Sequence, residues 1–216
     1  MSPVFRVGFG LVPAGNILTE KRSNMSTKKS LGAKTIAFPT PAWAVATYDS
    51  EGKPNVMTVA WGGICCSKPP CVAVSLRKAT YTYEAISARQ SFTVNIPSAS
   101  QVMAVDFFGV NSGRKIDKFA ATGLTPVKSE LVDAPFIDEF PLVLECRVLH
   151  TLEIGLHTQF VGEIIDVKAD ESLITDSGLD MEAIRPFAFI PENREYRVIG
   201  ESLGKAFSIG REQKDS

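Results

Sequence analysis

The sequence lacks an excess of either charge: 23 Lys and Arg residues stand against 24 Asp and Glu residues, giving a formal net charge of −1. Nucleic-acid-binding proteins usually show a basic stripe, and no window of this chain concentrates positive charge. No apolar run approaches the roughly 18 residues that span a bilayer. We therefore expect a cytoplasmic protein that binds neither nucleic acid nor membrane. Its expected partners are small molecules or a second copy of itself.

The motifs of the common catalytic classes are also missing. The chain contains no Walker loop, no H-E-x-x-H and no G-x-G-x-x-G between a strand and a helix, and its one G-x-S-x-G match, at 200–204, does not lie between an expected strand and an expected helix. Hydrolase, P-loop and Rossmann-type functions are therefore poorly supported. The two histidines, His150 and His157, are seven residues apart across an expected turn, which does not suit a metal-binding or catalytic pair.

Cysteine is scarce, with four residues in the chain. Cys65, Cys66 and Cys71 lie close together in the sequence, and Cys146 lies far from them. Adjacent cysteines on a strand face opposite sides. Two prolines stand between Cys66 and Cys71, and no nearby histidine completes a zinc site. There is no C-x-x-C motif, and a chain of this length does not need a disulfide framework. We expect reduced, buried cysteines and no metal.

Residues 1–24 differ from the rest because they show no clear periodicity and are followed by Met25, which begins an ordinary-looking start. A secretory signal is one interpretation, but prolines and glycines interrupt the apolar stretch. We expect a disordered tail or a mis-assigned start over 1–24, and a single domain over 25–216.

The chain after Met25 is rich in strand patterns. Short turn-forming clusters separate the apolar runs, and strands joined this tightly are antiparallel. The expected strands cover 35–48, 55–66, 71–77, 91–97, 141–151 and 159–168. Short helices are expected over 80–90, 101–110 and 117–122. This order predicts a mainly β fold, a β-barrel with peripheral short helices.

Two local patterns point to a ligand. Alternate strand residues share a face, so Asn55 and Trp61 bracket two apolar side chains on one side; this face lines either a pocket for a planar ligand or simply the core. Thr80 is suited to be a helix N-cap, and Arg77 precedes it. A helix start with nearby cations is either a phosphate-binding site or an ordinary capped helix.

Six segments taken together carry a resemblance. They are NVMTVAW (55–61), SKPPCVAVSLRKATYTYEAI (67–86), SFTVNIP (91–97), GRKIDKF (113–119), GLHTQFVGEI (155–164) and YRVIGESLGKAF (196–207). In this order they resemble the flavin reductase-like family, and especially its flavoredoxin-type members. The resemblance implies an FMN-binding split barrel, usually a homodimer with the flavin near the subunit interface.

The resemblance also implies a set of cofactor-binding residues. Asn55 and Trp61 would lie along the flavin. The ribityl chain and phosphate would be held by Ser75, Arg77 and Thr82.

Three further residues complete the implied site. Lys118 would add positive charge near the phosphate, and His157 would contact the cofactor. An aromatic side chain from residues 186–189, Phe189 in our interpretation, would close the pocket. No role carries over to Cys65 or Cys66.

The implied activity is that of a flavoprotein oxidoreductase that transfers electrons from NADH or NADPH through FMN to free flavin or another acceptor. Two alternatives stay open. One is a flavoredoxin-type electron carrier that is reduced by a redox protein partner. The other is a binding module for flavin or haem without turnover. An absent acid–base pair does not discriminate, because the cofactor supplies the hard chemistry.

Overall fold

The computed structural model describes residues 27–210. Residues 35–210 belong to one compact unit, and residues 27–34, which belong to a separate unit, form neither helix nor strand. The tail predicted over 1–24 lies outside the described residues, and the single domain over 25–216 stays a prediction. In the part of the chain that the structure describes, no helix has the length and hydrophobicity to cross a membrane.

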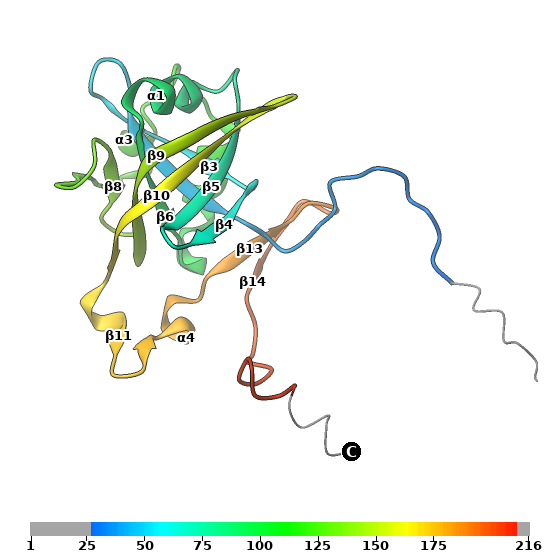
Figure 1. Ribbon diagram of the computed structural model, residues 1–216. Coiled ribbons are helices and arrows are strands. Elements are labelled where there is room, and N and C mark those ends of the chain that lie inside the picture. Colours follow the sequence, from blue (N-terminus) through cyan, green and yellow to red (C-terminus); the bar gives the residue numbers. More distant parts are fainter. Residues whose placement is uncertain (1–26, 211–216) are drawn as a thin grey trace, which may run out of the picture. The chain divides into compact units, whose positions relative to one another are not determined.

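A seven-stranded antiparallel sheet forms the body of the molecule (Figure 1). Its strands, in chain order, are β2 (Trp43–Tyr48), β3 (Pro54–Val59), β4 (Gly62–Ser67), β5 (Pro70–Arg77), β6 (Ser91–Ile96), β9 (Leu142–Ile154) and β10 (His157–Ala169). They are arranged in the order β3-β2-β6-β9-β10-β5-β4. The mainly β fold is confirmed, and the strands joined by short turns pair antiparallel: β2 with β3, β4 with β5 and β9 with β10.

The sheet closes into a barrel because its two edge strands are neighbours in the chain. Only Ala60 and Trp61 separate the end of β3 from the start of β4, although these strands lie at opposite edges of the sheet. At this junction the Ser75 amide of β5 donates a 2.8 Å hydrogen bond to the Trp61 carbonyl, which continues the β4–β5 pairing. One strand was predicted over 55–66, and this was wrong, since β3 pairs with β2 whereas β4 pairs with β5.

Apolar side chains are buried on both sides of the barrel wall. Inside, the core comprises Val45, Val59, Val72, Val74, Leu76, Ile86, Phe92, Val94, Leu144, Cys146 and Phe160. A second cluster outside contains Ala44, Ala46, Val56, Val105, Phe108 and Phe119. Neighbouring residues of β2 therefore enter different clusters, as the alternation of side chains along a strand requires.

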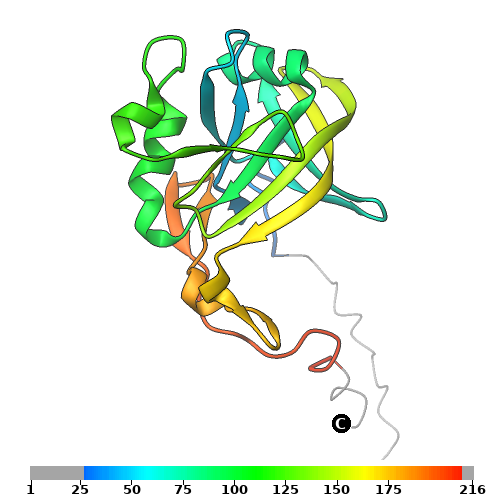
Figure 2. The same ribbon diagram turned by 90° about the vertical axis from the view of Figure 1, so that its left-hand side faces the viewer.

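The helices lie where the sequence predicted them. They are α1 (Tyr81–Arg89), the 3-10 helix η1 (Ala99–Gln101) with α2 (Val102–Val110), and α3 (Lys118–Thr122). Ile86 of α1 enters the barrel core, and Val105 and Phe108 of α2 cover the outer cluster. Figure 2 shows α2 on one flank of the barrel.

The β9–β10 hairpin is longer than the sequence predicted. A loop over 152–158 was expected, but both strands extend to a two-residue turn at Gly155 and Leu156, with Gly155 at φ +51°. Glycine favours the positive φ that such hairpin turns need. Further along β10, Gly162 packs against Phe92, and a Cβ there would lie 2.6 Å from the ring carbon Cζ.

Several short elements between residues 126 and 198 were not predicted, because their apolar runs are too brief to show a period. β1 (Thr40–Pro41), β13 (Phe187–Ile190) and β14 (Glu195–Val198) form a small sheet. The remaining elements are β7 (Pro126–Lys128) with β8 (Pro135–Ile137), β11 (Ile174–Thr175) with β12 (Gly178–Leu179), the 3-10 helix η2 (Glu171–Leu173), and α4 (Met181–Ile184).

Candidate functional site

Two adjoining hollows lie where β3, the segment between β3 and β4, and β5 meet the start of α1. The first, here called the strand groove, has a volume of about 190 Å³ and is lined by Met57, Thr58, Val59, Ala60, Trp61, Ser75, Leu76, Arg77, Thr80 and His157. The second, here called the helix-start pocket, has a volume of about 240 Å³ and is lined by Met57, residues 79–82, residues 108–113 and Lys118. Met57 and Thr80 line both, so the two hollows are contiguous.

The strand groove brings together residues from three strands and the β3–β4 junction. Arg77 at the end of β5 stands opposite His157 at the start of β10. Gln159 Nε2 donates a 3.4 Å hydrogen bond to Ser75 Oγ. Arg77 is exposed and forms no ion pair within the described chain, whereas the neighbouring Lys78 is paired with Glu153. Arg77 therefore offers an uncommitted positive charge at the edge of the groove.

The start of α1 is not capped by its own side chain. Thr80 occupies the N-cap position, but its hydroxyl donates to the Arg77 carbonyl at 2.8 Å and accepts no cap hydrogen bond. By contrast, Asp117 accepts from the Ala120 amide at the start of α3. The first amides of any helix have no intrahelical acceptor. The amides of Tyr81 and Thr82 at the start of α1 are therefore available to an anion.

Lys118 supplies a buried positive charge in the helix-start pocket. Only 4% of the residue is exposed. Its Nζ donates hydrogen bonds of 2.8 Å to the carbonyls of Val56 and Phe108. No carboxylate among the described residues pairs with it, and burial lowers its pKa from 10.5 to about 8. A negative charge in the pocket would offset this cost of burial.

Asn55 stands behind the pocket. It is buried, and its Nδ2 donates a 2.8 Å hydrogen bond to Thr82 Oγ1. The loop after α2 closes over it at Gly113, where a Cβ would lie 2.1 Å from Asn55 Oδ1 and 2.9 Å from Tyr81 Cδ1. Asn55 therefore positions the first turn of α1 and the loop, and lines neither hollow.

Tyr81 is held at the pocket rim by contacts on both sides. Its hydroxyl donates to Asp49 Oδ2 at 2.9 Å, and this hydrogen bond, with burial, raises the pKa of Tyr81. The Arg114 guanidinium lies 5.0 Å from the Tyr81 ring centroid and pairs with Glu84 at 2.7 Å. The polar loop 111–114 and Tyr81 were not predicted as site residues.

The structure brings most of the predicted residues together. Trp61, Ser75, Arg77 and His157 line the strand groove, while Thr82 and Lys118 line the helix-start pocket. Their binding roles stay predictions.

Phe189 lies elsewhere. It is half-buried in β13, where its ring centroid is 5.7 Å from that of Tyr196, and its carbonyl accepts from Thr40 Oγ1 at 3.1 Å. It lines neither hollow. Within one chain, the structure therefore does not bring Phe189 to the residues that it was expected to cover.

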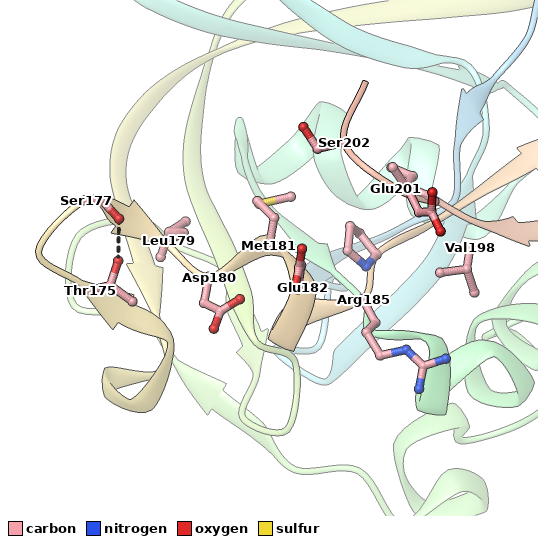
Figure 3. A pocket seen from close by; sticks show the side chains of 13 residues that line it. Thr175, Ser177, Leu179, Asp180, Met181, Glu182, Arg185, Val198, Glu201 and Ser202 are labelled. Carbon is pink, nitrogen blue, oxygen red and sulfur yellow. Dashed lines mark hydrogen bonds between the residues drawn. The ribbon is translucent and has the colours of Figure 1, made fainter. Parts of the chain in front are cut away.

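A larger hollow of about 1000 Å³ lies among the carboxy-terminal segments (Figure 3). Some of its polar groups are occupied locally: Thr175 and Ser177 share a hydrogen bond, and Asp180 caps α4 through the Ala183 amide. Arg185 forms no ion pair in the described chain. No set of polar groups converges there, so the strand groove and the helix-start pocket are the better candidate site.

Comparison with known proteins identifies the family. Residues 35–189 match the Flavin reductase like domain. The chain belongs to this family, and its barrel is the split barrel that the resemblance implied.

Two solved structures are similar over nearly their full length. Flavoredoxin of Desulfovibrio vulgaris (Miyazaki F) is 55% identical, with a TM-score of 0.81 over 85% of this chain and 99% of that one. Flavoredoxin from Methanosarcina acetivorans is 31% identical, with a TM-score of 0.79 over 86% of this chain and 100% of that one. A protein of Archaeoglobus fulgidus is 38% identical over 115 residues, which span 53% of this chain and 65% of that relative.

Proposed function

We propose that the chain binds FMN in the strand groove and the helix-start pocket. The observation that carries this proposal is the uncapped start of α1 beside the buried, carboxylate-free Lys118. Two unpaired amides, a helix dipole and a buried ammonium group together suit a phosphate ester. A neutral ligand would gain less from this arrangement, because only a charged group gains from both the helix dipole and the ammonium charge.

The two hollows divide the ligand between them. The amides of Tyr81 and Thr82, with Lys118 and Arg77, would hold the phosphate. Trp61, Ser75 and His157 would hold the ring and the ribityl chain, since they line the adjoining strand groove.

A comparison of FMN with riboflavin tests this assignment, because only FMN carries the phosphate. We expect Arg77→Ala to weaken FMN by at least about 10-fold, in line with loss of a charge-assisted hydrogen bond, and to leave riboflavin nearly unchanged. Arg147→Ala is the matched control, because Arg147 is an exposed arginine of β9 that pairs with Glu163. Equal losses for both ligands would refute the phosphate assignment.

With FMN held by these residues, the chain would act as an oxidoreductase that transfers electrons from NADH or NADPH to free flavin or another acceptor. Hydride acceptance is the chemistry that the flavin itself supplies. In the strand groove, Arg77 and His157 are the titratable side chains, and no carboxylate lines it. The chain's own residues would thus bind and orient the flavin and the nucleotide without an acid–base pair. The family membership supports this oxidoreductase function.

The similarity to two flavoredoxins supports a second candidate, an electron carrier that receives electrons from a redox protein partner. Anaerobic titration of the yellow protein separates the two functions. Bleaching by NADH or NADPH at a catalytically useful rate supports the oxidoreductase. A yellow protein that neither nucleotide bleaches supports the carrier. A colourless preparation that takes up no FMN would refute both.

We also propose that the chain acts as a cytoplasmic homodimer. Exposed apolar side chains gather along the β9–β10 hairpin, namely Leu149, Leu152, Ile154 and Leu156. Surface of this kind is typical of protein interfaces. Sedimentation velocity tests the proposal: a dimer is expected for the natural chain, and Leu152→Lys with Leu156→Lys should yield monomer. A monomeric natural chain would refute it.

A further inference from the structure

Three of the four cysteines gather at the turn of the β4–β5 hairpin, which extends beyond the barrel wall in Figure 2. Cys66 on β4 stands directly opposite Cys71 on β5, and the pair Ser67 and Pro70 closes the two-residue loop beyond them. Cys65 lies at the register shift between Ile64 and Cys66, so it has no direct partner on β5. The hairpin register thus joins two cysteines that the sequence alone did not connect.

The cross-strand position matches the geometry of a disulfide. Directly opposite residues of an antiparallel pair have Cα atoms about 4.5–5.5 Å apart and side chains on the same face. Disulfides span Cα separations of roughly 4.4–6.8 Å. The two side chains can therefore be bridged without moving the strands.

The thiols already lie near one another. Cys65 Sγ donates to the Cys71 carbonyl at 3.6 Å, and Cys71 Sγ donates to the Pro69 carbonyl at 3.4 Å. Burial raises the pKa of Cys71, and the neighbouring Cys66 and Cys65 thiols and the Glu163 carboxylate raise it further. Glu163 stands opposite Cys71 on β10 and is paired with Arg147.

Exposure divides the pair into two roles. Cys66 is exposed on the edge strand, whereas Cys71 is only 3% exposed. Buried cysteines were expected, and this was wrong for Cys65 and Cys66, because one edge of β4 is unpaired at the end of the sheet. Thiol–disulfide exchange with an external disulfide therefore begins at the exposed Cys66, and the buried Cys71 is the second thiol that resolves the mixed disulfide.

We propose that Cys66 and Cys71 form a reversible thiol–disulfide site that exchanges with low-molecular-weight disulfides. The Cys66 thiolate attacks one sulfur of a disulfide such as oxidised glutathione, forming a mixed disulfide and releasing one glutathione thiol. The Cys71 thiolate then attacks Cys66 Sγ and releases the second thiol. The two protein thiols lose two protons and two electrons, and the oxidant gains both as two thiols.

The site adjoins the strand groove through β5. Alternate residues of a strand share a face, so Cys71 lies on the same face as Ser75 and Arg77. The bridge would fix β4 to β5 at the turn end of the same hairpin that carries these two groove residues. The proposal does not depend on FMN binding, since the exchange uses only the thiols and the added disulfide.

Equilibration of the full chain in buffers from fully reduced to fully oxidised glutathione tests the proposal. Remaining thiols are alkylated in denaturant and counted by intact mass. We expect two of the four thiols to become unreactive together, with no retained glutathione, and to return on reduction. Four thiols that still alkylate after full oxidation, or stable glutathione adducts in place of an internal bridge, would overturn the proposal.

Single variants assign the bridge. Because Cys66 is exposed, the Cys66→Ser variant should fold normally. Both Cys66→Ser and Cys71→Ser should abolish the joint loss of two reactive thiols. Cys65→Ser is the matched control, because it removes the adjacent exposed thiol and should keep the joint loss. If Cys65→Ser abolishes the bridge while Cys66→Ser retains it, the assignment is wrong. Cys66→Ser still decides the matter if Cys71→Ser fails to fold.

Discussion

Lys118 should make FMN binding depend on pH in a way that riboflavin binding does not. In the chain without ligand its pKa is about 8. A phosphate beside Nζ favours the charged form and would raise this pKa back toward 10.5. Near pH 7 the lysine is charged before and after binding, so affinity there changes little with pH. Above pH 8 binding must take up a proton, so affinity falls as pH rises.

The size of the effect follows from the two pKa values. A full return from about 8 to 10.5 corresponds to roughly 3 kcal/mol at 1.36 kcal/mol per unit. Between pH 7 and pH 9.5, the dissociation constant for FMN should then rise by up to about 25-fold. Tyr81 is the other titratable group that lines the pocket, and its pKa is raised by its hydrogen bond to Asp49.

Quenching of flavin fluorescence, recorded at fixed ionic strength, measures both dissociation constants across this range. Riboflavin is the internal control, because it shares the ring and lacks the phosphate. The Lys118→Met variant should bind FMN more weakly at pH 7 and lose the slope. An FMN affinity that is level to pH 9.5 in the natural chain, or an unchanged slope in Lys118→Met, would refute the reasoning.

Three further substitutions test the fold and the site. Gly113→Ala should weaken FMN by at least about 10-fold, since its Cβ meets buried atoms, whereas Gly63→Ala, with no atom within 4 Å, should not. Gly162→Ala should lower the free energy of unfolding by about 1–3 kcal/mol in urea titrations, and an unchanged midpoint would contradict the close packing. Lys168→Met should cost about 2–3 kcal/mol at pH 7, because it leaves the fully buried Glu145 carboxylate unpaired, and an unchanged urea midpoint would exclude this cause.

The fold was largely predictable because its strands alternate and its turns are marked. The 55–66 strand was predicted as one because Ala60 and Trp61 carry no turn signal. What divides it is pairing: β3 and β4 hydrogen-bond to different neighbours at opposite edges of the sheet. The pairing partners of β3 and β4 depend on residues far along the chain, so the local periodicity of this segment does not predict them.

The candidate site shows the same limit. Arg77 and Lys118 could be proposed because a cation near a helix start has a direct chemical meaning. Asn55 was expected to lie along the ligand, yet it lines neither hollow. The loop at Gly113 covers it, and its amide hydrogen-bonds Thr82. The pairing of Cys66 with Cys71 also depends on the hairpin register, which spacing alone did not reveal.

The uncapped start of α1 ties the local stability of this helix to whatever occupies the pocket. The far half of α1 is anchored in the barrel through Ile86, while the first turn lacks a side-chain acceptor of its own. Amide hydrogen exchange in that turn should therefore slow in proportion to ligand occupancy, as a bound phosphate supplies the missing acceptors. Amide exchange rates in the first turn of α1 would then report the fraction of protein with ligand bound, while exchange rates in the barrel strands stay unchanged.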